Sequence, residues 1–333
     1  MDRGRRQGRP NVVDTSVADS ARDRILRRRP GAAAVPDQAV HKTRWEHFHQ
    51  YRRRAEVIAV ERLTPTGTDL LTLQVIDGED FDFEPGQFIG LAVELNGQLR
   101  TRPFCVWSAR SSQSLLRLLL RVVPDGPLSQ YLAARTPGDV LPFRGPLGRS
   151  MVPEHPGGRL DLICTGVGIG PFLGLVRHLL DHGDDRPVRL HWGLRLTEDI
   201  CLIDELEALV RDHPDFVYQI SLSRPPPEWR GLVGRVTHTV PPLLESLSDR
   251  HFVLCGNGAM IAELHGALYE AGVPGERIHR EFYFNMRHRP DRATIAAIRR
   301  RFIANDVTSP LKIFHALGID LDADLDASTA SPA

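Results

Sequence analysis

Two motifs suited to binding phosphate, about sixty residues apart, constrain the fold of this chain more than any other feature. The first comprises segments 102–105 (R-P-F-C) and 126–129 (G-P-L-S). The second is segment 165–172 (T-G-V-G-I-G-P-F), which directly follows the apolar run 160–164. One glycine-rich turn after a strand is weak evidence, since many α/β proteins have one. Two such sites in one chain indicate two nucleotides held face to face.

Composition and charge are consistent with a globular protein of two domains. The 333 residues are enough for two sizeable cores, and 41% hydrophobic with 25% charged residues is an ordinary balance. Residues 1–54 carry 14 Lys/Arg against 6 Asp/Glu, so in a neutral chain the remainder is acidic by eight charges. An acidic body argues against nucleic acid as the main partner.

The cysteines and the hydropathy pattern exclude several other classes. The four cysteines lie far apart, with no C-x-x-C pair and no Cys/His cluster, at Cys105, Cys164, Cys201 and Cys255. This spacing excludes a zinc ribbon and a built-in plant-type iron–sulfur domain, so no metal site is predicted. The chain has no signal-peptide core and no apolar stretch of about 18 residues. We therefore expect a soluble, cytoplasmic protein with reduced thiols and no membrane span.

Both ends of the chain differ from its body. Residues 1–40 lack apolar periodicity and predict a disordered basic arm, and the aromatic residues of 41–54 predict a short helical lead-in. Residues 285–333 predict a helical C-terminal extension that ends in a disordered acidic tail. Its first helix is expected at 292–304, and a second short helix has Ser309 as its N-cap.

The body divides into two patterns. Residues 55–153 contain short apolar runs broken by Gly, Pro, Asp and Asn, which predict an antiparallel β-barrel. Residues 157–284 alternate strands with helices, which predicts an α/β domain with a parallel sheet. The strands expected in the first domain are 56–60, 70–75, 87–91 and 115–123. The second domain is expected to have strands 160–164, 188–193, 216–222 and 252–255 and helices 172–180, 199–211 and 259–271.

The first motif has the chemistry of a pyrophosphate site. Arg102, at the end of an expected strand, presents a planar fork suited to phosphate oxygens. Phe104, two residues on, lies on the same strand face and can cover an aromatic ring. Gly126 and Ser129 lie where a short helix begins, and backbone N–H groups there bind phosphate. Singly, these are an ordinary surface arginine and an N-cap serine; only their combination with the second motif favours a site.

The second motif has the logic of a doubly wound fold. Its glycines allow the backbone to turn sharply and a pyrophosphate to approach the start of a helix. The spacing differs from the usual G-x-G-x-x-G because Pro171 is expected at the first helical position. A purely structural glycine turn is the alternative.

Six segments together resemble a known family. They are R-P-F-C (102–105), G-P-L-S (126–129), R-G-P-L-G (144–148), T-G-V-G-I-G-P-F (165–172), H-W-G-L-R (191–195) and C-G-N-G-A-M (255–260). In order and spacing, from about residue 55 to about residue 284, they resemble the ferredoxin–NADP reductase superfamily. The resemblance implies a β-barrel flavin domain followed by an α/β nicotinamide-cofactor domain.

The resemblance also implies roles for individual residues. Those matching the flavin site are Arg102, Pro103, Phe104, Cys105, Gly126, Pro127, Leu128 and Ser129. Arg121, outside these segments, is a further candidate for cofactor binding. Those matching the nicotinamide-cofactor site are Thr165, Gly166, Val167, Gly168, Pro171, Cys255, Gly256, Asn257 and Met260. Cys105, Cys255 and Glu281 are the implied catalytic residues.

Two departures from the family pattern matter. Phe104-Cys105 stands where the family has Tyr-Ser or Tyr-Thr, so a hydroxyl is lost and the thiol is a weaker donor toward flavin N5. Segment 281–284 resembles the family's closing strand, yet 49 residues follow it. The resemblance leaves two possibilities: either Tyr283 or Phe284 covers the flavin, or the extension covers it. The alternative is that these aromatic residues belong to the hydrophobic core.

The cofactors are expected to be FAD and NADP, with NAD possible. FAD is expected rather than FMN because the resemblance includes a pyrophosphate loop, which FMN would leave unused. Arg195 and Arg224 follow successive strands where a 2′-phosphate lies in NADP-binding relatives. Against NADP, Glu198 and Asp199 would repel that phosphate, and 195–209 also resembles NADH-using reductases of oxygenase systems.

The function expected is hydride transfer from NAD(P)H to FAD and then single-electron transfer to a separate acceptor. Without iron–sulfur ligands of its own, the chain requires a ferredoxin, a flavodoxin or an oxygenase component as that acceptor. The alternatives are a non-catalytic flavin-binding electron-transfer subunit, an NADH-dependent reductase component of an oxygenase, and a polyanion binder that uses residues 1–54.

Overall fold

The computed structural model describes residues 52–78, 81–108, 114–153, 158–284 and 288–305. The expected basic arm, most of the helical lead-in, the helix at Ser309 and the acidic tail lie outside these residues. The first strand begins at Arg53, so the last two residues of the predicted lead-in belong to a strand instead.

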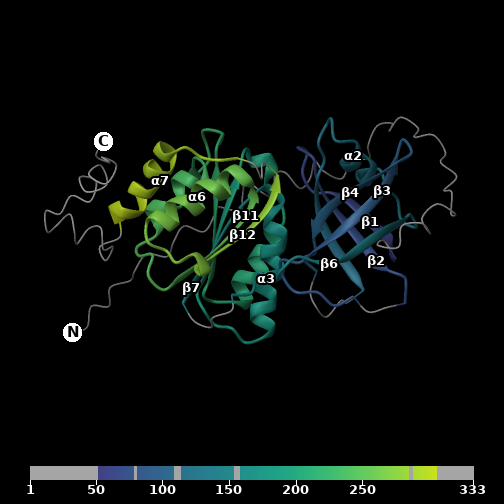
Figure 1. Cartoon of the computed structure of the whole chain (residues 1–333), viewed down its shortest axis with the longest axis horizontal. Coiled ribbons are helices and arrows are strands. Elements are labelled where there is room, and N and C mark those ends of the chain that lie inside the picture. The colour runs from purple at the N-terminus through teal and green to yellow at the C-terminus, as the bar shows by residue number, and fades with distance from the viewer. Residues whose placement is uncertain (1–51, 79–80, 109–113, 154–157, 285–287, 306–333) are drawn as a thin grey trace, which may run out of the picture.

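The first sheet has six antiparallel strands in the order β4-β3-β6-β1-β2-β5, which curve into a half-barrel (Figure 1). The strands are β1 (Arg53–Arg62), β2 (Thr68–Val75), β3 (Phe88–Leu95), β4 (Gln98–Cys105), β5 (Leu115–Arg121) and β6 (Val140–Leu147). Helix α2 (Pro127–Ala133) follows β5. Alternating residues such as Val57, Leu71 and Leu73 are fully buried, because successive side chains point to opposite faces of a strand. The predicted antiparallel domain is confirmed.

The second sheet has six parallel strands in the order β10-β9-β8-β7-β11-β12. They are β7 (Arg159–Thr165), β8 (Val188–Leu194), β9 (Phe216–Leu222), β10 (Leu232–Val233), β11 (Arg250–Asn257) and β12 (Ile278–Phe284). The helices are α3 (Ile169–Asp181), α4 (Ile203–Asp212), α5 (Val236–Thr239), α6 (Gly258–Glu270) and α7 (Arg292–Asn305). The central strands are apolar and buried because helices cover both faces. The predicted α/β domain is confirmed.

Strand β7 marks the place where a ligand is expected in such a sheet. β8 and β9 lie on one side of it and β11 and β12 on the other, so the chain reverses direction of winding at β7. Ligands of doubly wound sheets bind at the carboxyl ends of the strands, at this switch point. The loops after β7 and β11 are therefore the edge of the second sheet where a nucleotide is expected.

The two sheets are joined through helix α3, which stands between them in Figure 1. Trp107 and Leu119, from the first sheet's side, belong to the same buried cluster as the apolar face of α3. A Cβ atom at Gly174 would lie 3.3 Å from the Cα of Trp107, so the missing side chain lets the helix approach the tryptophan closely. Arg117 lies 4.2 Å from the centre of the Trp107 ring and pairs with Glu205 of α4 at 3.4 Å.

Three ionisable side chains from neighbouring strands of the second sheet are buried together. Asp161 of β7 accepts a hydrogen bond from Nη1 of Arg250 at 2.7 Å, and its other oxygen lies 3.4 Å from Nε2 of His191. All three side chains are almost completely buried. Burial raises the pKa of Asp161, but the hydrogen bonds and charges of His191 and Arg250 outweigh it and hold that pKa below its usual value.

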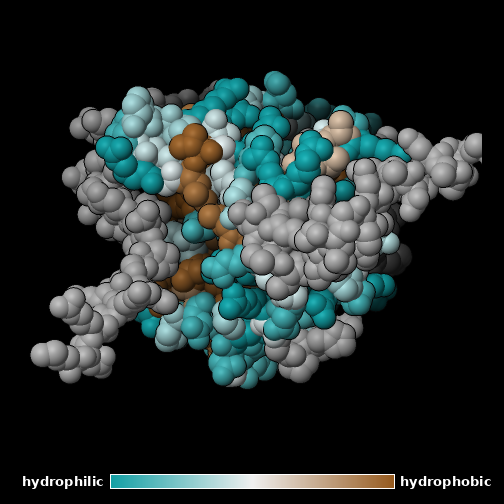
Figure 2. All heavy atoms as spheres, turned by 90° about the vertical axis from the view of Figure 1, so that its left-hand side faces the viewer, coloured by the Kyte–Doolittle hydropathy of each residue, from teal (hydrophilic) through white to brown (hydrophobic). Residues whose placement is uncertain are grey.

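The described helix of the C-terminal extension packs on the far side of the second domain. Ile298 and Phe302 of α7 are buried, and Ile295 fits against Gly266 of α6, where a Cβ would lie 2.8 Å from its Cδ1. Figure 1 shows α7 on the side of the molecule opposite the first sheet. The face at this end is mostly hydrophilic, with one narrow strip of apolar atoms (Figure 2). Helix α7 therefore lies away from the first sheet and does not cover the predicted flavin site.

Candidate active site

Arg102 lies within β4 and not at its end, because the strand continues to Cys105. β4 is the edge strand of its sheet, where Pro103 breaks no required hydrogen bond. The Arg102 guanidinium is exposed and donates to its neighbour, the carbonyl of Thr101, at 2.9 Å. No carboxylate of the described residues pairs with it. Phe104 is half-buried against the barrel core, and Cys105 is buried.

The second part of the first motif forms a tight loop before α2. Gly126 is the N-cap, and no acidic side chain occupies the first turn. The Ser129 hydroxyl accepts from the Val123 amide at 3.0 Å and donates to the Gly126 carbonyl at 2.8 Å. A Cβ at Gly126 would lie 2.7 Å from that hydroxyl oxygen. Pro127 begins the helix, and Leu128 packs in the core.

A pyrophosphate fits the chemistry of this region. The exposed guanidinium of Arg102 has no carboxylate partner among the residues that the structure describes. The first turn of α2 contains no acidic side chain, and the exposed Asp125 lies just before its N-cap. Arginine binds phosphate oxygens through two parallel hydrogen bonds. These residues would hold the pyrophosphate of FAD, and the half-buried ring of Phe104 lies two residues further along the same strand.

The glycine motif forms a short 3₁₀ turn, η3 (Gly166–Gly168), between β7 and α3. Gly166 has a φ of +56°, and nothing lies within 4 Å of the position of its missing Cβ, so the backbone borders open space. Helix α3 begins at Ile169, so Pro171 is its third residue and not the first as predicted. Proline is tolerated there because the first four N–H groups have no partner within the helix. With no acidic residue in that turn, the start of α3 is suited to an anion such as the dinucleotide pyrophosphate.

Side chains from three strands hold this loop in shape. The Thr165 hydroxyl accepts from the Asn257 amide at 3.0 Å, and Trp192 Nε1 donates to the Gly166 carbonyl at 2.9 Å. Gly256 has a φ of +119°, and a Cβ there would lie 2.6 Å from the Thr165 hydroxyl oxygen. Asn257 also caps α6 through the Ala259 amide at 2.9 Å. Thr165, Gly256 and Asn257 thus organise the loops after β7 and β11. Gly168 packs against the backbone at the end of β11, and Val167 packs against the core.

Cys255 and Met260 are packing residues in this structure. Cys255 is 0% exposed and lies in the core cluster on the α3 face of the sheet. Met260 is buried in the cluster on the α6 face. A direct contact between the Cys255 thiol and a nicotinamide, which its predicted catalytic role requires, has no support in this geometry.

Glu281 lies beside Cys255 in the neighbouring strand β12 and is half-buried. Burial raises the pKa of its carboxyl to about 7. This residue therefore exchanges a proton near neutral pH, as its predicted catalytic role requires. Tyr283 lies two residues further along β12, and its side chain is outside the described part of the chain.

Replacing Glu281 by Gln is expected to remove a pH dependence of stability. The folded pKa of about 7 is above the usual value of 4.5, so between these values the folded chain holds a proton that the unfolded chain has lost. Glu281 thus stabilises the fold below about pH 4.5, and this contribution is lost as the pH rises through 7. Because the side chain is partly exposed, we expect a modest effect. Relative to Glu281→Gln, the free energy of unfolding of the wild type should fall by about 1–2 kcal/mol between pH 5 and pH 8. Urea unfolding of wild type and Glu281→Gln at pH 5 and pH 8 measures it; an unchanged difference between the two proteins contradicts it. The exposed Glu276→Gln is the control.

Arg195 and Arg224 come together at the carboxyl ends of β8 and β9. The Arg224 amide donates to the Arg195 carbonyl at 2.9 Å, so the two loops are joined. Both side chains are exposed, and neither pairs with a carboxylate in the described ranges. Two free guanidinium groups at this edge suit a phosphate group on the adenosine side of a dinucleotide.

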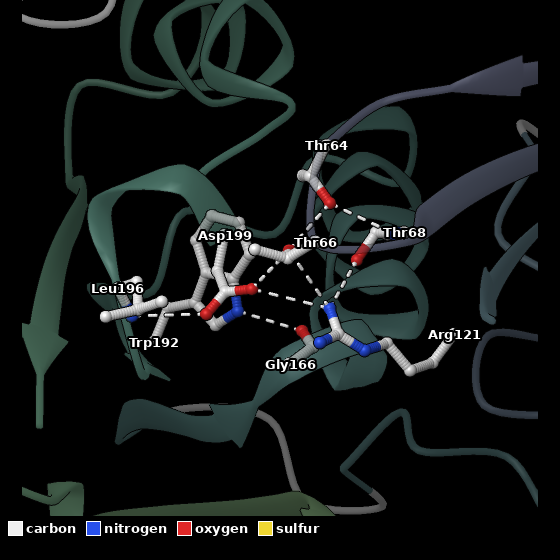
Figure 3. Close-up of polar contacts among 8 residues, drawn as sticks. All are labelled: Thr64, Thr66, Thr68, Arg121, Gly166, Trp192, Leu196 and Asp199. Carbon is white, nitrogen blue, oxygen red and sulfur yellow. Dashed lines mark hydrogen bonds and ion pairs between the residues drawn. The ribbon is translucent and has the colours of Figure 1, made fainter. Parts of the chain in front are cut away.

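Arg121 and Asp199 form a contact that sequence reasoning missed. Asp199 was expected only to repel a phosphate, but its carboxylate accepts from Thr66 at 2.5 Å and lies 3.4 Å from Arg121 Nη1 (Figure 3). Arg121, predicted to contact a cofactor, is half-exposed and also approaches the Thr66 and Thr68 hydroxyls at 3.3 and 3.4 Å. No sequence pattern marks Thr66, because its partner is 133 residues away.

Comparison with known proteins identifies both domains. Residues 56–151 match the family model of the oxidoreductase FAD-binding domain, and residues 162–265 that of the oxidoreductase NAD-binding domain. The chain is 33% identical over 237 residues to ferredoxin–NADP reductase B of Sorangium cellulosum, which covers 69% of this chain and 96% of that protein. The chain belongs to the ferredoxin–NADP reductase superfamily. The reductase is also 29% identical to the reductase component of propane 2-monooxygenase from Mycolicibacterium goodii, with 68% and 66% of the two chains covered.

A solved structure agrees with this assignment. The ferredoxin NADP⁺ reductase of Neisseria gonorrhoeae with bound FAD and NADP has a TM-score of 0.59 and 25% identity, covering 69% of this chain and 98% of that one. The protein is therefore an NAD(P)H-dependent flavoprotein reductase that binds FAD and NAD(P). None of the helices that the structure describes is long and apolar enough to cross a membrane.

Proposed function

We propose that this reductase takes electrons from NADPH in preference to NADH and delivers them singly to a separate ferredoxin, flavodoxin or oxygenase component. The observation that carries the cofactor preference is the pair of exposed arginines at the carboxyl ends of adjacent strands, Arg195 and Arg224, neither of which pairs with a carboxylate of the described residues. The chemistry of hydride acceptance and single-electron release is supplied by FAD when bound.

The residues of the chain bind and orient the two nucleotides. Arg102 and the loop at Gly126 hold the flavin pyrophosphate, and Phe104 covers the ring system. The turn at Gly166 and the start of α3 hold the pyrophosphate of the nicotinamide cofactor. Glu281, with its pKa raised to about 7, holds a proton beside this site at neutral pH. Binding both cofactors in fixed positions converts an encounter in solution into a reaction within one complex.

The negative charges near Arg195 oppose a 2′-phosphate less than the sequence indicates. Asp199 is directed toward the first domain, where Arg121 compensates its charge and the Thr66 hydroxyl donates a hydrogen bond to it. Glu198 is exposed and accepts a hydrogen bond from the Thr197 hydroxyl at 2.9 Å. With Asp199 compensated, the two arginines dominate the charge at this edge, which supports NADPH.

Replacing Arg224 by Ala is expected to raise KM for NADPH by about 10- to 100-fold and KM for NADH less than twofold, because only NADPH carries the charge that Arg224 contacts. Steady-state assays with both cofactors and ferricyanide measure the effect. Arg211→Ala is the matched control, since this exposed arginine lies in the last turn of α4, before the amino end of β9, whereas Arg224 follows the carboxyl end of that strand. Equal changes with both cofactors would show that Arg224 does not contact the 2′-phosphate.

A separate acceptor is supported by the cysteines. All four are buried and lie on separate segments of the chain, whereas an iron–sulfur cluster needs its thiolate ligands gathered at one site. Anaerobic titration with NADPH and then NADH, followed by flavin absorbance, tests the cofactor preference: bleaching by near-stoichiometric NADPH alone supports it, and bleaching by NADH alone opposes it. Reduction of cytochrome c with added ferredoxin or flavodoxin then tests the acceptor.

An NADH-dependent reductase component of an oxygenase is the second candidate. It is favoured by the 29% identity to the propane 2-monooxygenase reductase component, of which this chain spans 66%. Bleaching by NADH, together with electron transfer to an oxygenase component and none to ferredoxin or flavodoxin, would support this second candidate over the first.

A further inference from the structure

The clasp, as we call Thr66, Arg121 and Asp199, joins the two domains at the nucleotide-binding edge (Figure 3). Thr66 lies in the turn between β1 and β2, and Arg121 ends β5, so both belong to the first sheet. Asp199 belongs to a 3₁₀ turn, η4 (Thr197–Asp199), that follows β8 of the second sheet. One carboxylate oxygen of Asp199 therefore binds two separate elements of the other domain.

The other oxygen of Asp199 holds its own domain's loop. Oδ2 accepts from the Leu196 amide at 3.1 Å, which closes the η4 turn directly after Arg195. The Asp199 side chain is only 10% exposed, so water competes little for these bonds. Hydrogen bonds to a charged group are stronger and more directional than those between neutral groups. The clasp thus links the β1–β2 turn to the loop that follows β8.

The other described contacts between the two domains are an apolar cluster and one further ion pair. Leu70, Trp107 and Leu119 share one buried apolar cluster with α3, and Trp107 lies against its glycines. Hydrophobic burial has no preferred direction, so this contact is less directional than the hydrogen bonds of the clasp. The ion pair of Arg117 with Glu205 lies beside that tryptophan. The clasp lies at a different point, next to the loop that carries Arg195. A rotation about the Trp107 contact would break it.

We propose that Asp199 is a positioning residue, which sets the angle between the two domains by binding Thr66 and Arg121. The inference rests on the reductive half-reaction alone and is independent of the acceptor and of the preference for NADP over NAD. Hydride transfer is sensitive to this angle, because a misplacement of about 1 Å between reacting atoms can reduce a rate about 100-fold. Loss of the clasp therefore lowers the rate of flavin reduction more than it weakens cofactor binding.

Thr66→Val tests the clasp without changing any charge, since it replaces the hydroxyl by a methyl group of similar size. In stopped-flow reduction of the FAD-loaded protein, by whichever nicotinamide cofactor reduces the wild type, we expect the limiting rate to fall about tenfold and the Kd of that cofactor to change less than twofold. Thr66→Ser, which keeps the hydroxyl, should stay within about threefold of wild type. Glu205→Gln, which removes the other ion pair, is the matched control and should stay within about twofold.

Hydrogen–deuterium exchange of the same proteins provides a readout that needs no reaction. Thr66→Val should speed exchange in segments 64–68 and 196–200, with an unchanged thermal midpoint and unchanged flavin content. A limiting rate within twofold of wild type would overturn the proposal. So would exchange that accelerates throughout the second domain, since this would show a general loss of stability. Failure of the wild type to be reduced by NADPH would contradict the proposed cofactor preference and leave the exchange test of the clasp intact.

Discussion

Arg102→Ala is expected to lower the affinity for FAD about 100-fold, so that the purified protein contains little flavin. The side chain is exposed, donates only to the Thr101 carbonyl among the described residues, and has no carboxylate partner there. Its charge is therefore available to the pyrophosphate, and a bidentate, charge-assisted contact of this type contributes about 2–3 kcal/mol. Flavin content per protein and fluorescence titration of the apoprotein with FAD measure the effect.

Two further variants separate charge from geometry in that experiment. Arg102→Lys keeps the charge but loses the planar fork, so its affinity should lie between those of wild type and Arg102→Ala. Arg100→Ala is the matched control: Arg100 is exposed in the same strand, and its guanidinium binds Gln98. If Arg100→Ala and Arg102→Ala lose flavin equally, the effect is one of general surface charge and Arg102 has no specific role.

Asp161→Ala is expected to reduce the free energy of unfolding by about 3–5 kcal/mol. The substitution leaves the Arg250 guanidinium almost fully buried without the carboxylate that it binds at 2.7 Å. An uncompensated charge in the interior is far more costly than the loss of a surface ion pair. Urea unfolding of the full-length protein at neutral pH, followed by circular dichroism, measures the change.

The control for Asp161→Ala is an ion pair at the surface. Glu270→Gln removes the 3.7 Å contact of α6 with Arg299 of α7, where both side chains are partly exposed, and should cost less than about 1 kcal/mol. Equal destabilisation by the two substitutions would mean that Arg250 finds another partner or water once Asp161 is lost. A double variant, Asp161→Leu with Arg250→Met, should recover much of the stability because no unpaired charge is left.

Some details of the site differ from their prediction. They concern where an element begins or ends and which way a side chain points. Pro171 was expected to begin α3, yet the helix begins at Ile169, because any position in the first turn can lack an N–H donor. Arg102 was expected to end its strand, yet β4 continues through Pro103 to Cys105, because an edge strand tolerates proline. Cys255 was expected beside the nicotinamide, but its side chain points into the core, since alternate residues of β11 face opposite sides of the sheet.

The amino-acid sequence by itself determined the antiparallel sheet, the parallel sheet and the glycine turn that follows β7. These features depend on short-range patterns: apolar periodicity, turn residues, and glycines at the end of a buried strand. Only the tertiary structure decided which distant side chains meet. Asp199 and Thr66 are 133 residues apart, and Asp161 and Arg250 are 89 apart. Such pairs arise from the packing of separate elements, and no local pattern in the chain specifies a contact made across that distance.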